Sequence, residues 1–209
     1  MRTAAQQTLA RGRPRCTDAH ARILRATREL LHSKTWNVLT VESVAARANV
    51  GKQTIYKWWG GLPALLLEAS LENLEIVAPA LDSGDTLHDV ADFLKRASRM
   101  LWETSMGRSL AMMIAEAQHD PAFGQMFREK FQKPRRAALI TLFRQGMRRG
   151  SLRADLDPEV LVDVIFGAVW YRLLSGRAAI DDDYIEQVIG LILPGIGVGR
   201  RAGHSQRKA

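Results

Sequence analysis

The sequence predicts an all-α fold in which a small N-terminal domain of three helices precedes a larger helical domain. Apolar residues recur at helical spacing, and no segment shows the alternation of apolar and polar residues that is typical of strands. Two short helices joined by a tight turn are predicted at residues 40–59. The charge is uneven, because residues 1–60 contain 11 Lys and Arg and 3 Asp and Glu, whereas the rest contains 19 of each. A basic module beside a neutral body is typical of nucleic-acid binding.

Residues 1–16 are polar and basic and are predicted to form a flexible arm. Arg11, Arg13 and Arg15 alternate with Gly and Pro in this arm. Such a slim, extended basic segment suits the narrow minor groove of A·T-rich DNA. The alternative is a tail that contributes only nonspecific charge. The first helix is expected over about residues 17–33, at the start of an N-terminal domain that reaches residue 61.

Residues 40–59 are predicted to form a helix-turn-helix. Thr40 is a good N-cap, and Asn49 and Gly51 permit the turn between the two helices. Small side chains on the first helix let the pair cross closely, as a helix-turn-helix requires. The apolar face of this first helix consists of Val41, Val44, Ala45 and Ala48.

The second helix of the pair has one clear core residue, Ile55. The 100° step per residue then points most of its other side chains outward or to the flanks. These polar side chains can form hydrogen bonds with phosphates and base edges. The predicted DNA-binding residues of the helix-turn-helix are therefore Thr40, Lys52, Gln53, Thr54, Tyr56 and Lys57.

Residues 62–194 are predicted to form the larger domain, followed by a flexible tail at 195–209. Pro63 fits the first turn of a helix that is expected to reach about residue 77. Gly107 is expected to break a later helix, and Asp-Pro pairs at 120–121 and 157–158 predict capped helix starts. The remaining helices are expected over about 86–106, 108–118, 121–149, 158–176 and 184–193.

Methionine and aromatic side chains gather in the middle helices of the larger domain. Such side chains suit an adaptable apolar pocket, and they suit an ordinary core equally well. In the first interpretation, the domain binds a small apolar or aromatic effector through Met100, Trp102, Met106, Met113, Phe123, Phe127 and Phe143.

The last two predicted helices are apolar almost all round, so one buried face cannot account for them. The second side is most simply buried against another copy of the chain, and Gly167 and Gly190 would let the helices approach closely. The alternative is a hairpin that lies wholly inside one chain, which is hard to achieve in so small a protein. The predicted dimer interface consists of Val164, Ala168, Tyr171, Val188, Ile189 and Ile192.

Several classes of protein are disfavoured by composition. No segment approaches the ~18 unbroken apolar residues of a membrane span, and no signal-peptide pattern occurs at the start, so we expect a cytoplasmic protein without a membrane partner. Cys16 is the only cysteine, which excludes a disulfide framework and a cysteine zinc site. Glu116, His119 and Asp120, with His88, could hold a metal in a phosphohydrolase-like helical enzyme, but further ligands are not evident. We therefore expect no catalytic residue, metal or cofactor.

A longer pattern covers the N-terminal domain and is strong over about residues 17–70, with weaker matches at 149–159 and 167–174. In the first stretch it consists of Ala26, Leu30, Leu31, Thr40, Val44, Ala45, Ala48, Val50, Thr54, Ile55, Tyr56, Trp59, Leu65 and Leu66. This pattern resembles the tetracycline-repressor (TetR) family of bacterial one-component regulators.

The resemblance implies an all-helical homodimer. Three N-terminal helices would bind an operator, the core of the larger domain would accept a small molecule, and the last two helices would build a four-helix interface. Leu62 departs from the family, which usually has a phosphate-binding Lys there. We expect a repressor that binds a palindromic double-stranded operator and is released by its effector. The alternative, besides the enzyme, is an architectural protein that binds DNA without sequence preference.

Overall fold

The computed structural model describes residues 13–33, 39–71, 83–176 and 178–196, and every element in these ranges is a helix. This confirms the predicted all-α fold. The N-terminal helices are α1 (Arg13–Leu31), α2 (Val41–Ala48), α3 (Lys52–Trp59) and α4 (Leu62–Leu71). The larger domain contains α5 (Thr86–Glu103), α6 (Met106–His119), α7 (Pro121–Phe127), the π-helical turn η3 (Arg128–Gln132), α8 (Lys133–Arg149), α9 (Pro158–Ser175) and α10 (Asp182–Ile196).

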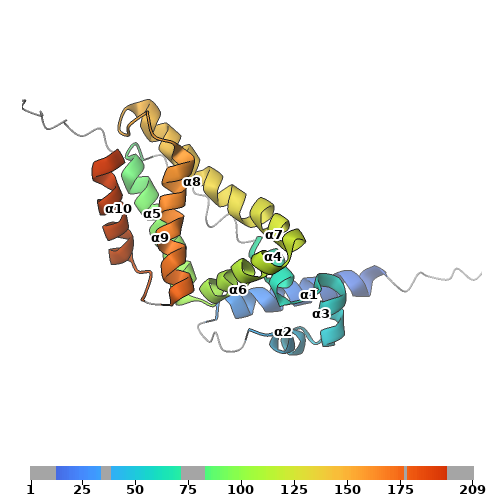
Figure 1. Cartoon of the computed structure of the whole chain (residues 1–209). Helices are drawn as coiled ribbons and strands as arrows, with labels where there is room; N and C mark the ends of the chain where they lie inside the picture. The colour runs from blue at the N-terminus through green and yellow to red at the C-terminus, as the bar shows by residue number, and fades with distance from the viewer. Residues whose placement is uncertain (1–12, 34–38, 72–82, 177, 197–209) are drawn as a thin grey trace, which may run out of the picture.

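The helices form two packed groups that meet near the middle of the molecule (Figure 1). Buried residues of α1–α4 share one hydrophobic core with residues of α6, α7 and η3. A second core joins α5, α8, α9 and α10, with α10 packed on α5 and α8 packed on α9. The two cores are joined by three side chains that pack against both of them, those of Met100, Leu101 and Leu173.

The helix ends follow local capping rules. The side chains of Asp85, Asp120 and Asp157 each accept hydrogen bonds from the first backbone N–H groups of the helix that follows. Gly150 and Gly176 adopt left-handed conformations at the ends of α8 and α9, where a side chain would be strained. These caps confirm the helix starts that were predicted from the Asp-Pro pairs.

Four predicted boundaries were wrong or lie outside the described residues. Helix α1 begins at Arg13 rather than near residue 17, and α10 continues through Pro194 to Ile196. The break after α5 comes before Gly107, which lies inside α6; a Cβ there would sit 2.2 Å from the Leu101 carbonyl oxygen, so glycine permits the close turn. Residues 72–77, where we expected the fourth helix to continue, are not among those described.

The helix predicted over 121–149 is interrupted by the π-helical turn η3. Pro134 follows directly, and proline lacks the N–H that a regular helix requires. The wider turn changes the rotation of the chain before α8 and places Phe131, Gln132, Arg135 and Arg136 along an internal cavity. None of the described helices is long and apolar enough to cross a membrane.

Candidate DNA-binding surface, effector cavity and dimer face

The helix-turn-helix has the geometry that the sequence predicts. Thr40 caps α2 through its side chain, which accepts a hydrogen bond from the Ser43 backbone N–H at 3.1 Å, and the Ser43 hydroxyl accepts one from the Thr40 N–H. Asn49 ends α2 in a left-handed conformation with φ of 52°. Ile55 is fully buried, and the predicted apolar face of α2 is buried against it and α1.

The orientation of α3 is fixed at its C-terminal end by α4 and α1. The Trp59 indole Nε1 donates a hydrogen bond to the Glu68 carboxylate at 2.7 Å. The same carboxylate lies 3.2 Å from His20 Nε2, and the His20 ring stacks on Trp59 with centroids 4.9 Å apart. Gly60 then ends α3 with a positive φ of 74°. Helix α3 is therefore held by contacts on three helices and presents its opposite side to solvent.

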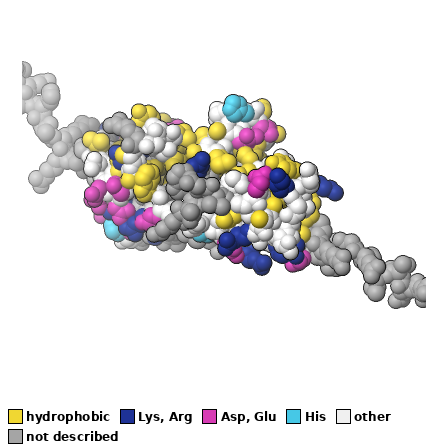
Figure 2. Space-filling view, turned by 90° about the horizontal axis from the view of Figure 1, so that it is seen from below, with side chains coloured by type: hydrophobic (Ala, Val, Ile, Leu, Met, Phe, Trp, Pro, Cys, Tyr) yellow, Lys and Arg dark blue, Asp and Glu magenta, His cyan; other side chains and the backbone are white. Residues whose placement is uncertain are grey.

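The outward side of α3 carries most of the predicted DNA-binding residues. Gln53, Tyr56 and Lys57 are exposed, and Thr54 is partly exposed. Lys52 is exposed but forms an ion pair with Glu42 at 3.1 Å, and the hydrogen bond from Lys52 lowers the pKa of the Glu42 carboxyl. Figure 2 shows Lys and Arg side chains on this half of the molecule with Asp and Glu side chains beside them.

The arginines of the predicted arm do not all have the expected conformation. Arg13 and Arg15 belong to the first turns of α1, so the extended conformation predicted for this segment was wrong at these two positions. Pro14 favours this outcome, because proline is well accommodated in the first turn of a helix. Arg11 lies outside the described residues.

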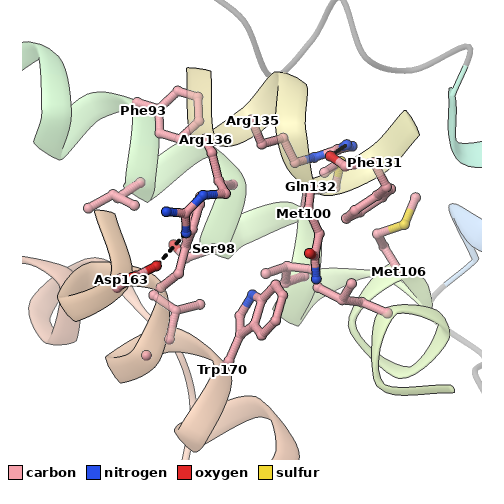
Figure 3. Close-up of a pocket in the computed structure, with 17 residues that line it drawn as sticks. Phe93, Ser98, Met100, Met106, Phe131, Gln132, Arg135, Arg136, Asp163 and Trp170 are labelled. Atoms are coloured by element: carbon pink, nitrogen blue, oxygen red, sulfur yellow. Dashed lines mark hydrogen bonds and ion pairs between the residues drawn. The ribbon is translucent and has the colours of Figure 1, made fainter. Parts of the chain in front are cut away.

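A cavity of about 280 Å³ lies between α5, α6, α9 and the junction of η3 with α8 (Figure 3). Its walls are mainly apolar and aromatic. Polar groups reach it from Ser98, Gln132, Arg135, Arg136 and Asp163. The apolar lining consists of Phe93, Leu94, Ala97, Met100, Leu101, Met106, Leu110, Phe131, Phe166, Gly167, Val169 and Trp170. An apolar hollow with a few polar groups is the usual form of a small-molecule site.

The two arginines of the cavity have different surroundings. Arg136 donates to Glu159 at 2.6 Å and to Asp163, and these hydrogen bonds raise its pKa. The Arg135 guanidinium lies 3.5 Å from the centroid of the Phe131 ring and donates to the Phe131 carbonyl oxygen at 2.8 Å. Burial lowers the pKa of Arg135 to about 10, because desolvation disfavours its charged form.

Only two of the predicted effector-binding residues, Met100 and Met106, line this cavity. Met113, Phe123 and Phe127 are buried in the core shared with α1–α4, and Phe143 is buried in the other core, so the core interpretation applies to these four. Trp102 is half exposed beside a separate surface hollow at Asp181–Asp183. The prediction missed the residues of η3, because nothing in the sequence except Pro134 signals the π-helical turn.

Helix α9 presents an apolar stripe to solvent. The stripe consists of Val160, Val164, Tyr171 and Leu174, and each of these side chains is at least half exposed. Gly167 lies on the same face, and a Cβ added there would meet no atom within 4 Å. On α10, Leu191 is 83% exposed, and a Cβ added at Gly190 would also meet no atom within 4 Å. Large apolar side chains gathered on one face indicate a surface that is buried in an assembly.

The predicted dimer interface is partly corrected by these exposures. Val164 and Tyr171 are exposed, and Ala168 and Ile192 are partly exposed, as an interface requires. Val188 and Ile189 are instead 7% and 8% exposed and pack within the chain itself, so their assignment to the interface was wrong. Ile189 belongs, with Ile185, to the core that α10 shares with α5, α8 and α9.

The residues considered for a metal site do not come together. Among the described residues, no group of three or more His, Cys, Asp and Glu side chains could hold a metal ion. The Asp120 carboxylate caps α7 through the N–H groups of Ala122 and Phe123, and His88 lies 3.5 Å from Asp92. The geometry therefore gives the phosphohydrolase alternative no support.

Comparison with known proteins assigns both parts of the chain to one family. Residues 23–69 match the family of bacterial regulatory proteins named tetR, and residues 80–192, more than half of the chain, match the tetracyclin repressor-like C-terminal domain. The HTH-type transcriptional regulator YdeS of Bacillus subtilis (strain 168) is 34% identical over 179 residues, which cover 86% of this chain and 90% of that protein.

Two further matches agree with this assignment. The crystal structure of the TetR family transcription regulator SCO0332 has a TM-score of 0.69 and 32% identity, covering 85% of this chain and 98% of that one. The DNA-binding transcriptional repressor TetR of Mycobacteroides abscessus is 24% identical over 178 residues, with 83% and 90% of the two chains covered. The chain therefore belongs to the TetR family and is a ligand-responsive, DNA-binding transcriptional regulator.

Proposed function

We propose that this regulator is a repressor that binds an inverted-repeat operator as a homodimer and leaves it when a small molecule fills the cavity. The outward face of α3 carries this proposal. Gln53, Tyr56 and Lys57 are exposed on a helix whose opposite side is fixed by Ile55 and Trp59. A rigid helix with exposed hydrogen-bond donors suits the major groove, where base edges can be distinguished.

The contacts with DNA phosphates would be made by residues in and around α3. Leu62 packs against the N-terminal core and offers no donor, so the phosphate contact that a Lys makes in other family members is absent from this side chain. Lys57 and the Thr40 hydroxyl lie at the exposed surface, and Lys52 would exchange Glu42 for a phosphate. Arg11 and its neighbours in the arm add positive charge to the same domain.

Dimerisation is assigned to the apolar stripe of α9 together with Leu191 of α10. The stripe residues are spaced at four, seven and three positions, with Gly167 in the larger gap, so they stay on one face along the helix. Two copies of this face would form a four-helix interface. The pair of α3 helices would then contact half-sites about one helical turn of DNA apart, roughly 34–36 Å.

The cavity has direct contacts through which it could influence α1 and α4. Met106 lines the cavity, and its Sδ lies 3.7 Å from the hydroxyl oxygen of Ser70 on α4, which donates to the Leu66 carbonyl. The preceding residue, Ser105, donates through its backbone N–H to the Leu31 carbonyl at 3.0 Å and through its hydroxyl to the Ser33 carbonyl at 2.9 Å. A ligand that displaces Met106 would therefore shift the supports of α1 and α4, provided that it binds one arrangement better than the other.

Selection of genomic DNA fragments with the purified protein tests this function. The expected result is a small set of fragments whose footprints each show one protected inverted repeat. Transcription in vitro from a promoter that overlaps the repeat should fall when protein is added. Uniform protection without a repeat would instead show an architectural protein, and a rise in transcription would show an activator.

A further inference from the structure

The cavity contains one positive charge that no carboxylate of the described residues compensates. Arg136 bonds both Glu159 and Asp163, so its charge is matched within the chain. Arg135, the preceding residue of α8, forms no ion pair in the part of the chain that the structure describes. Its known partners are the Phe131 ring and the Phe131 carbonyl oxygen, which are both uncharged.

The position of the Arg135 charge, partly buried and without a counter-ion among the described residues, is energetically unfavourable. Burial lowers the pKa of Arg135 to about 10, but the side chain still carries its charge at neutral pH. A desolvated cation without a counter-ion costs free energy, and the one carbonyl oxygen uses only one of the five N–H donors of a guanidinium. An anion that enters the cavity would recover part of this cost, so the site favours negative ligands.

On the basis of the effector cavity proposed above, we infer that the effector is a compact organic acid whose carboxylate binds Arg135. The planar guanidinium matches a carboxylate with two parallel hydrogen bonds. Gln132 also lines the cavity, and Figure 3 shows its side chain extending toward Trp170, so its amide adds a hydrogen-bonding group to the apolar walls. The aromatic walls of Phe93, Phe166 and Trp170 would hold the apolar body of the acid.

A positively charged effector is less compatible with these contacts. Among the described residues, Asp163 is the one acidic side chain that lines the cavity, and it already forms an ion pair with Arg136. A cation would have to displace Arg136 and would approach the uncompensated charge of Arg135. The size also argues for a compact molecule, because about 280 Å³ is at the lower end of the usual range for ligand pockets, roughly 300–1,000 Å³.

A matched set of probes tests the charge preference. Binding of 2-naphthylacetate, 2-naphthylacetamide and 2-(2-naphthyl)ethylamine to the full chain would be measured by titration calorimetry. The three share one aromatic body and differ in charge. The acid should bind about tenfold or more tightly than the amide, as expected for a charged hydrogen-bond pair, and the amine should bind weakest. In Arg135→Gln, the acid should lose this advantage over the amide.

Two variants control for unrelated effects. Arg148→Gln removes the same charge from an exposed position on the same helix and should leave the preference intact. Arg135→Lys keeps the charge and should retain part of the preference, which separates charge from folding. An unchanged preference for the acid in Arg135→Gln, equal binding of acid and amide by the native chain, or tightest binding of the amine would each overturn the inference.

Operator release separates this inference from the proposed function. If the amide binds as well as the acid and both release the operator, the cavity is the effector site but the acid class is wrong. If the acid binds through Arg135 without changing operator affinity, the anion site stands and the proposed release is wrong. Failure of all three probes to bind the native chain would contradict both.

Discussion

The proposed DNA-binding surface and the proposed effector cavity differ in the surroundings of their positive charges. On α3, Lys57 is exposed and solvated, so contact with a phosphate replaces water and counter-ions at little cost. In the cavity, Arg135 is partly buried against Phe131 and has no carboxylate partner among the described residues. The exposed charge on α3 therefore needs no rearrangement to meet a phosphate, whereas the charge of Arg135 would gain a counter-ion only from a bound anion.

The two regions also differ in how they are assembled. The proposed DNA-contacting face is the outward side of the eight-residue helix α3, which is held by Ile55 and by the hydrogen bond from Trp59 to Glu68. The cavity is assembled from α5, α6, α8 and α9 with the turn η3. Met106 and Phe131 line the cavity and also belong to the core of α1–α4. The cavity therefore borders directly on the core that supports the DNA-binding helices.

Breaking the dimer should have the largest effect, because it removes one DNA-binding surface while leaving each cavity in place. The double variant Val164→Glu with Tyr171→Glu adds two carboxylates to the apolar stripe of α9. We expect monomers that retain their helical content and bind the operator at least about 100-fold more weakly, since both half-sites must be engaged together. Sedimentation and operator titration measure the two effects.

The control for this change is Ala137→Glu, which adds a carboxylate at an exposed position of α8 outside the stripe. It should remain dimeric with full operator affinity. A double variant that stays dimeric and binds normally would show that the interface lies on another face.

The preference for one DNA sequence should depend on the exposed side chains of α3 and not on the cavity. If Gln53 contacts a base edge, Gln53→Ala should cost about 1–3 kcal/mol of binding free energy on the operator and little on random DNA. Effector affinity should not change, because Gln53 lies far outside the cavity lining. Parallel titrations of operator and random DNA check this, and an equal loss on both would contradict base contact.

The sequence predicted the DNA-binding domain at the level of single residues because its geometry is local. The cap at Thr40, the left-handed turn at Asn49 and the buried position of Ile55 all depend on neighbours within a few residues. The same short-range rules located the starts of α7 and α9. They failed at Arg13, where the charge suggested an extended arm although Pro14 is suited to a helix start.

The effector cavity could not be predicted in the same way because its walls come from distant segments. Met100 and Met113 look alike in the sequence, yet the first lines the cavity and the second is fully buried in the core. Only the crossing of α5, α6 and α9 decides between them. Val188 and Ile189 show the same limit at the dimer face, since apolar character alone does not tell which side of α10 faces α5.

The cost inferred for the Arg135 charge can be measured without any effector. Replacement of Arg135 by Met removes a partly buried charge that has no carboxylate partner in the described chain and should raise the free energy of unfolding by about 1–2 kcal/mol. The sign follows from the pKa, because the unfolded chain holds the Arg135 proton more tightly than the native chain does. The penalty is therefore fully present at neutral pH and begins to decrease only when the pH rises above about 10.

The neighbouring Arg136→Met is the matched comparison for this measurement. It leaves Glu159 and Asp163 without their shared partner and should not stabilise the protein. Urea unfolding of both variants and of the native protein at one protein concentration measures the difference in unfolding free energy. A less stable Arg135→Met would show that the contacts with Phe131 outweigh the cost of burying the charge.

The smallest expected effect lies at Lys57, where a solvated charge is exchanged for a phosphate contact. Lys57→Ala should weaken operator and random DNA alike, by about 1 kcal/mol at moderate salt, and should reduce the slope of log K against log salt concentration by about 1. Lys57 is exposed on α3, so its removal should leave stability nearly unchanged, unlike the removal of Arg135. Titrations of operator and random DNA at several salt concentrations measure both the loss of affinity and the change in slope. A loss confined to the operator would mean that Lys57 contacts a base. Lys57 would then make a specific contact, as we infer for Arg135 in the cavity, and would not act only as a solvated charge.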